Sequence, residues 1–272
     1  MLRKVCLALI AVAVLVPSLC AQTVDEIIAK NVQARGGADK LKGVQSVKST
    51  VTMAMGPGME APATLIQKRK SGARLEFTIQ GLTGIQAYDG KDAWQVMPFM
   101  GKKDPELMSG DEAKEMEEMS DIDGPLVDYK SKGHQVELLG KEKIEGTDAY
   151  KLKISLKNGD VMTTYIDSDS FLEIKGETTR TVRGTEQMFE SAIGDYKEVN
   201  GIMFPFAIES SAKGSTEKVK YTITKIELNV PVDDAIFKMP PPAPPAPKAD
   251  APKTDSAKPD APKAAPANPP QN

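Results

Sequence analysis

Hydrophobic and polar side chains alternate along most of the chain after residue 45. In residues 150–157, large apolar side chains at the even positions alternate with lysine or serine at the odd positions. A period of two predicts a β-strand that buries one face and exposes the other to water. Asp89-Gly90, Asn158-Gly159 and Asn200-Gly201 separate such segments, and these dipeptides favour tight hairpin turns. Because short connections join antiparallel neighbours, the pattern predicts about 10 to 11 antiparallel strands.

Helical patterns occur at the beginning of the chain and once in its middle. Thr23 and Glu26 have the spacing of a capping box, and apolar residues at helical spacing continue up to Gly36-Gly37. A second short helix is expected at residues 38–42, and a third, strongly acidic helix at residues 111–120. A sheet of this length must twist and curl, and the helices are the main material available to cover it. The predicted fold is therefore mainly β (α+β): a curled antiparallel half-barrel with helices covering the concave face.

Residues 1–21 have the pattern of a secretory signal. A basic start is followed by an apolar run over residues 5–16 and then by small residues at Cys20 and Ala21. The run is shorter than the ~20 residues of a membrane-spanning helix. Cleavage after Cys20 or Ala21 predicts a periplasmic protein. The alternative is a membrane-anchored lipoprotein acylated at Cys20, although Leu19 stands where a lipidation site favours a small residue.

The composition changes abruptly at the other end of the chain. Residues 240–272 consist largely of proline, alanine, lysine and aspartate, without a large apolar side chain. Such a segment cannot bury enough surface to offset the entropy lost on ordering, so a disordered tail is expected. The predicted organisation is a signal peptide at 1–21, one half-barrel domain at 22–239 and the tail at 240–272.

Composition excludes several classes of function. Cys6 and Cys20 both lie in the predicted signal, so the mature chain has no disulfide, thiol nucleophile or thiolate metal ligand. With 38 acidic and 35 basic residues, the chain lacks the basic stripe that nucleic acids require. No glycine-rich phosphate motif opens a helix after a strand. We therefore expect no cofactor and no nucleic-acid partner.

Candidate catalytic and metal-binding residues each have a simpler interpretation. His134 is the only histidine, and no spacing of serine and acidic residues predicts catalytic partners for it. Residues 121–124 (Asp-Ile-Asp-Gly) begin like a calcium loop, but Pro125 interrupts it, so a helix-terminating turn is the preferred interpretation. The carboxylates of residues 111–120 are interpreted as a solvated helix face. The sequence predicts a protein that is not an enzyme, with no catalytic residue and no metal site.

Four segments carry a resemblance to a known family: YDGKDAWQVMPF (88–99), DGPLVDYKSKG (123–133), VELLGKEKIEGTDAYKLKI (136–154) and VPVDDAIFKMP (230–240). Together with the order of elements, they resemble the outer-membrane lipoprotein-sorting protein family, whose fold is that of LolA-like periplasmic carriers, and in particular its acidobacterial-type paralogues. The resemblance covers residues 23–239. It implies a half-barrel that encloses an apolar cavity for lipid or acyl chains. It also implies a buried arginine that locks a helical lid, for which Arg69 and Arg74 are both candidates.

The stretch of residues 88–129 is where we expect function. It contains the only tryptophan and several of the 13 methionines, whose flexible, polarisable side chains adapt to varied apolar ligands. A softly packed core is one interpretation. The resemblance favours the other, a movable lid over an acyl-chain cavity. The residues predicted to line the cavity and lid are Leu75, Phe77, Ile79, Trp94, Met97, Phe99, Met100, Met116 and Met119.

Two functions remain open from the sequence. The first is a periplasmic carrier or binding protein for lipid or lipoprotein acyl chains, with an acylated lipoprotein and inner- and outer-membrane proteins as its partners. The second is a non-enzymatic envelope interaction or sensor module that uses the same fold to dock a membrane-protein partner. A monomer is expected in both cases.

Overall fold

The computed structural model describes residues 22–182 and 185–241. The predicted signal, 1–21, and residues 242–272 of the predicted tail lie outside these ranges. No helix within the described ranges is long and apolar enough to span a membrane.

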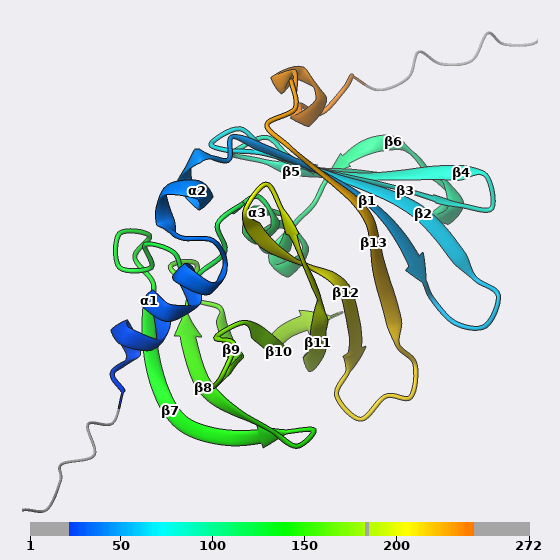
Figure 1. Cartoon of the computed structure of the whole chain (residues 1–272). Helices are drawn as coiled ribbons and strands as arrows, with labels where there is room; N and C mark the ends of the chain where they lie inside the picture. Colours follow the sequence, from blue (N-terminus) through cyan, green and yellow to red (C-terminus); the bar gives the residue numbers. More distant parts are fainter. Residues whose placement is uncertain (1–21, 183–184, 242–272) are drawn as a thin grey trace, which may run out of the picture. The chain divides into compact units, whose positions relative to one another are not determined.

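The strands form one antiparallel sheet (Figure 1). Its thirteen strands lie in the order β6–β5–β4–β3–β2–β1–β13–β12–β11–β10–β9–β8–β7. The first and last strands pair in the middle of the sheet, and every other pair of neighbours is consecutive in the chain. The strands are β1 Ser46–Ala54, β2 Glu60–Lys68, β3 Gly72–Ile79, β4 Leu82–Tyr88, β5 Ala93–Met97, β6 Lys102–Leu107, β7 Gln135–Ile144, β8 Thr147–Ser155, β9 Val161–Asp167, β10 Glu173–Val182, β11 Thr185–Val199, β12 Ile202–Ala212 and β13 Val219–Leu228.

The mainly β, curled and open architecture predicted from the sequence is confirmed, with more strands than expected. The alternation of hydrophobic and polar residues does not predict strand β6. Its sequence, KKDPEL, has no apolar alternation and contains Pro105. Because β6 is an edge strand, one of its sides has no hydrogen-bonding neighbour, so a proline can be accommodated.

The sheet stays open between its two edge strands, β6 and β7. These strands are consecutive in the chain, and the connection between them, residues 108–134, contains helix α3 (Gly110–Met119). Helix α3 contacts β3, β4 and β5 on one arm of the sheet and β10 on the other. Figure 1 shows it between the blue-to-cyan arm and the green-to-yellow arm. The stretch in which the sequence predicts a cover therefore spans the opening of the sheet.

The leading helices form as their sequence signals predict. The Thr23 hydroxyl accepts the Glu26 backbone N–H at 3.3 Å, and the Glu26 carboxylate accepts the Thr23 N–H at 2.9 Å, which completes the capping box of α1 (Val24–Ala34). Gly36 has φ +121°, and a Cβ there would lie 2.3 Å from the Gly201 carbonyl oxygen. Only glycine allows the close approach that separates α1 from α2 (Ala38–Gly43).

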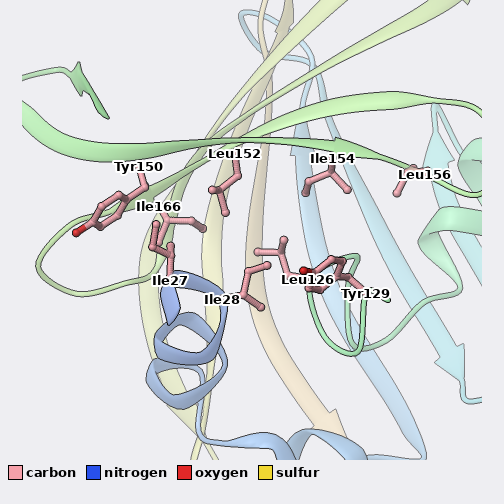
Figure 2. Close-up of a cluster of buried hydrophobic side chains, with 9 residues drawn as sticks. All are labelled: Ile27, Ile28, Leu126, Tyr129, Tyr150, Leu152, Ile154, Leu156 and Ile166. Carbon is pink, nitrogen blue, oxygen red and sulfur yellow. The ribbon is translucent and has the colours of Figure 1, made fainter. Parts of the chain in front are cut away.

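A buried apolar cluster holds α1 against the sheet (Figure 2). Ile27 and Ile28 on α1 pack against alternate side chains of β8 and against Ile166 of β9. Residues of the 108–134 connection enter the same cluster. Its buried members are Ile27, Ile28, Leu126, Tyr129, Tyr150, Leu152, Ile154, Leu156 and Ile166. The period-two pattern of residues 150–157 thus turns its apolar side toward α1.

Candidate functional site

The first arm of the sheet presents an apolar inner wall. Phe77 of β3 and Met97 of β5 pack around Phe99, with the two phenylalanine rings 5.6 Å apart. Leu75 and Ile79 lie beside them on the same face. The structure therefore brings together five of the predicted cavity residues. We call this group the inner wall: Leu75, Phe77, Ile79, Met97 and Phe99.

The inner wall depends on a glycine at the centre of β4. A Cβ on Gly84 would lie 2.8 Å from Phe99 Cε1, 3.0 Å from Phe77 Cζ and 3.2 Å from Met97 Sδ. Gly84→Val is therefore expected to lower the free energy of unfolding by about 1–3 kcal/mol through overpacking, as measured by urea unfolding. Gly194→Val is the control, because a Cβ on this strand glycine meets no atom within 4 Å. Equal stability of the two variants would contradict the tight packing.

Helix α3 turns its apolar side toward the sheet. Met116 is 1% exposed and packs on Ala73, Ala93 and Met108. Met119 packs partly buried beside this cluster, and its carbonyl oxygen accepts a hydrogen bond from the Gln67 side chain at 2.5 Å. Two further predicted residues, Met116 and Met119, therefore fasten α3 to the first arm.

The opposite side of α3 is tied to the second arm by charge. Glu118 accepts hydrogen bonds from Arg180 of β10 at 2.9 Å and from Asn158 at 3.1 Å. Lys114 pairs with Asp160 at 2.8 Å. The interpretation of this helix as a solvated acidic face is wrong for Glu118, whose side chain is 18% exposed. Helix α3 is a strap with apolar contacts on one arm and ionic contacts on the other.

Two of the predicted residues lie away from the inner wall. Trp94 is 1% exposed, and neighbouring Ala93 packs under α3, so Trp94 points to the opposite face of the sheet. Its Nε1 donates to the Phe237 carbonyl oxygen at 2.7 Å. Phe237 belongs to η2 (Asp234–Phe237) in the closing motif. Met100 of η1 (Pro98–Met100) is 64% exposed.

Arg69 fastens the segment that follows α3. Its guanidinium binds both carboxylate oxygens of Asp123, at 2.6 and 2.7 Å, and donates to the carbonyl oxygens of Leu41 and Val44. Burial alone would raise the pKa of Asp123, but the hydrogen bonds and charge of Arg69 outweigh burial and hold it below the ordinary value. Arg35 donates to the Asp123 carbonyl oxygen at 2.8 Å. Arg69 thus joins the turn at residues 121–124 to α2 and to the end of β2.

The two arginine candidates are therefore separated by their contacts. Arg69 connects the 108–134 segment, α2 and the sheet. Arg74 instead pairs with Glu76 at 2.7 Å, donates to the Ile236 carbonyl oxygen and lies over the Trp94 ring, on the opposite side of the sheet. Of the two candidates, Arg69 is the one whose contacts reach the segment after α3. The sequence does not reveal Asp123 as its partner, because the two residues are 54 positions apart.

A pocket of about 450 Å³, here called the inner pocket, lies on the second arm of the sheet. The C-terminal half of α1 and residues 121–126 line it together with β8 to β12. Its apolar lining includes Leu126, Ile154, Met162, Ile193, Phe204 and Ile208. Asn31, Arg35, Thr164, Glu173 and Tyr196 add polar groups. None of the sequence-predicted residues lines this pocket, because the strand pattern shows which residues share a face but not where the sheet curls.

A second pocket of about 570 Å³, the mouth pocket, adjoins the inner pocket. The two share Asp121, Pro125 and Met162. The end of α3 and the single histidine, His134, line the mouth pocket. His134 Nδ1 accepts the Lys157 backbone N–H at 3.1 Å, and burial, with the nearby charge of Lys132, lowers its pKa. In the described ranges, no group of three or more histidine, cysteine or acidic side chains is placed to hold a metal ion.

Comparison with known proteins supports the fold but no sequence family. No protein-family model and no curated protein matches the chain. A LolA superfamily protein from Nitrosomonas europaea is similar in structure, with 18% identity, a TM-score of 0.54, and coverage of 80% of this chain and 98% of the other. A DUF1329 family protein from Desulfovibrio piger has 14% identity, a TM-score of 0.54 and the same coverage. An outer membrane lipoprotein-sorting protein domain from Vibrio parahaemolyticus has 13% identity, a TM-score of 0.51, and coverage of 77% and 94%. The chain therefore has the LolA-like fold.

Proposed function

We propose that this protein is a non-enzymatic periplasmic carrier or binding protein for lipid or lipoprotein acyl chains. The observation that carries the proposal is the pair of adjoining pockets beneath residues 121–126, beside the α3 strap. The likeness to a LolA superfamily protein and to a lipoprotein-sorting domain supports it at the level of the fold. We propose the inner wall, which shares the face of the sheet that α3 packs on, as a further contact surface for a long chain.

The energetics of this function come from desolvation. Burying an acyl chain gives about 0.8 kcal/mol for each CH₂ group removed from water. The inner pocket, at about 450 Å³, is within the range of roughly 300–1,000 Å³ that small-molecule sites occupy. Release then requires the covering segments to move. The α3 strap is one of these segments, so release requires its ionic contacts to Arg180 and Asp160 or its apolar packing around Met116 to separate.

A cavity-filling variant tests the proposal. Gly176 lines the inner pocket, and a Cβ there would meet only Glu173 Oε1, at 3.6 Å, so Gly176→Phe places a ring in the pocket with little strain at its base. We expect native mass spectrometry of the full chain, expressed with its signal and purified from cells, to show bound lipid. Occupancy in Gly176→Phe should be at least about tenfold lower.

Gly194→Phe is the matched control. Gly194 lies on neighbouring β11, and a Cβ there meets no atom within 4 Å. This variant should retain the lipid. A wild-type protein that takes up no lipid, even after incubation with phospholipid vesicles, would exclude the carrier function. Equal occupancy in both variants would place the lipid elsewhere.

A further inference from the structure

The inner pocket contains a carboxyl group without a paired cation. Glu173, at the start of β10, accepts a hydrogen bond from Thr164 Oγ1 to its Oε1 at 2.5 Å. In the described part of the chain its other oxygen, Oε2, has no hydrogen-bond partner, and no lysine or arginine lies within salt-bridge distance. Burial raises the pKa of Glu173, against the smaller effects of Thr164 and the Arg35 charge. Glu173 is partly exposed, and its Oε2 is not among the fully buried atoms without a partner, so a ligand in the pocket can reach this oxygen.

A second unpaired acceptor lies beside it. Asn31 of α1 is 2% exposed, and its Nδ2 donates to the Phe171 carbonyl oxygen at 2.8 Å. That bond places the amide next to the start of β10, where Glu173 lies. Among the described residues, Asn31 Oδ1 is buried without any hydrogen-bond partner. Buried side-chain oxygens are normally satisfied, so this one is an exception that calls for a partner.

Two other carboxylates that line the pocket are paired within the protein. Asp121 pairs with Lys132 at 2.5 Å, and Glu177 pairs with Lys175 at 2.7 Å. Arg35 donates to the Asp123 carbonyl oxygen. Its charge also acts on Glu173. A ligand carboxylate has no donor to offer these two oxygens, whereas a neutral hydroxyl group can donate to the Glu173 oxygen directly and to Asn31 Oδ1 once that side chain turns.

We propose that the inner pocket holds the hydroxylated head group of a neutral single-chain lipid, such as a monoacylglycerol, whose hydroxyl groups donate to Glu173 Oε2 and Asn31 Oδ1. The Glu173 oxygen receives the first bond. Asn31 Oδ1, which protein atoms cover, receives the second when its side chain turns toward the pocket. The acyl chain then runs along the apolar lining toward Met162 and the mouth pocket. This inference rests on the proposed function and specifies its ligand.

Three probes with the same acyl chain test the head-group preference. These are 1-monolauroylglycerol, methyl laurate and laurate, titrated below their micellar concentrations and followed by calorimetry. The glyceryl and methyl esters share the chain and ester carbonyl and differ in the hydroxyl groups. We expect monolauroylglycerol to bind about tenfold more tightly than methyl laurate, which is the contribution of a hydrogen bond to an acceptor in the pocket. Laurate should bind more weakly than monolauroylglycerol.

Two glutamate variants locate the preference. Glu173→Met should abolish the tenfold difference while leaving the affinity for methyl laurate within about twofold. Glu177→Met, on the same strand, is the matched control and should keep the difference, because that carboxylate is already paired with Lys175 and Tyr165.

The possible results distinguish failure of the head-group inference from failure of the carrier function. Equal affinity of the wild type for both esters, or tightest binding of laurate, would overturn the head-group inference and leave the carrier function standing. If no probe binds, both fail. The comparison of the two esters on the wild-type protein tests the inference by itself. It therefore remains a test even if Glu173→Met fails to fold.

Discussion

Replacing Arg69 with methionine is expected to lower the free energy of unfolding by on the order of 3 kcal/mol and to open the segment around Asp123. The side chains of Arg69 and Asp123 are 21% and 9% exposed, so the pair is largely desolvated. Methionine keeps much of the side-chain volume but removes every donor. It leaves the Asp123 carboxylate unpaired and removes the donors to the carbonyl oxygens of Leu41 and Val44. Urea unfolding measures the stability, and hydrogen exchange of residues 38–44 and 120–127 measures the opening.

The pH dependence of this loss has a definite sign. In the wild type the pKa of Asp123 is below its ordinary value, so the pair stabilises the fold above the unfolded-state pKa of about 3.9. That stability decreases as the pH falls through the lower pKa of the folded state. In Arg69→Met, a buried carboxyl without a partner prefers its neutral form, and protonation relieves the cost. The difference between the two proteins should therefore be largest near neutral pH and should narrow below about pH 4.

Arg74→Met provides the matched control. Arg74 is also mostly buried, at 16% exposure, but it binds Glu76 and the Ile236 carbonyl oxygen on the other side of the sheet. Its loss should increase exchange around residues 234–237 and leave residues 120–127 protected. If hydrogen exchange increases at the same residues in both variants, Arg69 does not specifically hold residues 120–127 in place.

Most of the architecture could be predicted from the sequence because it is encoded locally. Alternating side chains identify the strands, and Gly90, Gly159 and Gly201 have the positive φ values, from 78 to 93°, that their turns require. The capping box of α1 is likewise a signal within four residues. The same alternation places Trp94 and its neighbour Ala93 on opposite faces of the strand. Our prediction from the sequence nevertheless groups Trp94 with the cavity and lid residues. Its assignment as a ligand contact stays a prediction.

The pocket could not be predicted because it depends on contacts between distant segments. Asn31 and Phe171 are 140 positions apart, and Arg69 and Asp123 are 54 apart. Neither pair has a spacing or motif that identifies it. Glu173 is one of many charged residues in alternating strands, and only the curl of the sheet places it in a pocket. Long-range geometry thus determines the polar centre of the site, whereas the inner wall follows from composition and strand pattern.

Replacing Phe237 with alanine is expected to lower the free energy of unfolding by about 3–5 kcal/mol, because large-to-small changes in a packed site lose burial and leave a cavity. Phe237 is 1% exposed, and its carbonyl oxygen accepts the Trp94 Nε1 hydrogen bond. The closing motif is held there by further bonds, from Lys68 to Asp234 and from Arg74 to Ile236. Loss of the phenyl ring should loosen η2 and admit water to Trp94. Urea unfolding gives the stability.

The fluorescence of Trp94 reports the local effect directly, because the chain has one tryptophan. Its emission should shift to longer wavelength in native Phe237→Ala. Ile236→Ala, at the neighbouring partly exposed position, should show a smaller loss of stability and little shift. Comparable behaviour of the two variants would mean that Phe237 does not anchor the motif. Lipid titration of the wild type adds a separate test. A change in emission would place Trp94 in contact with the ligand. Constant emission, with lipid uptake seen by mass spectrometry, would confine binding to the face of the sheet that carries α3.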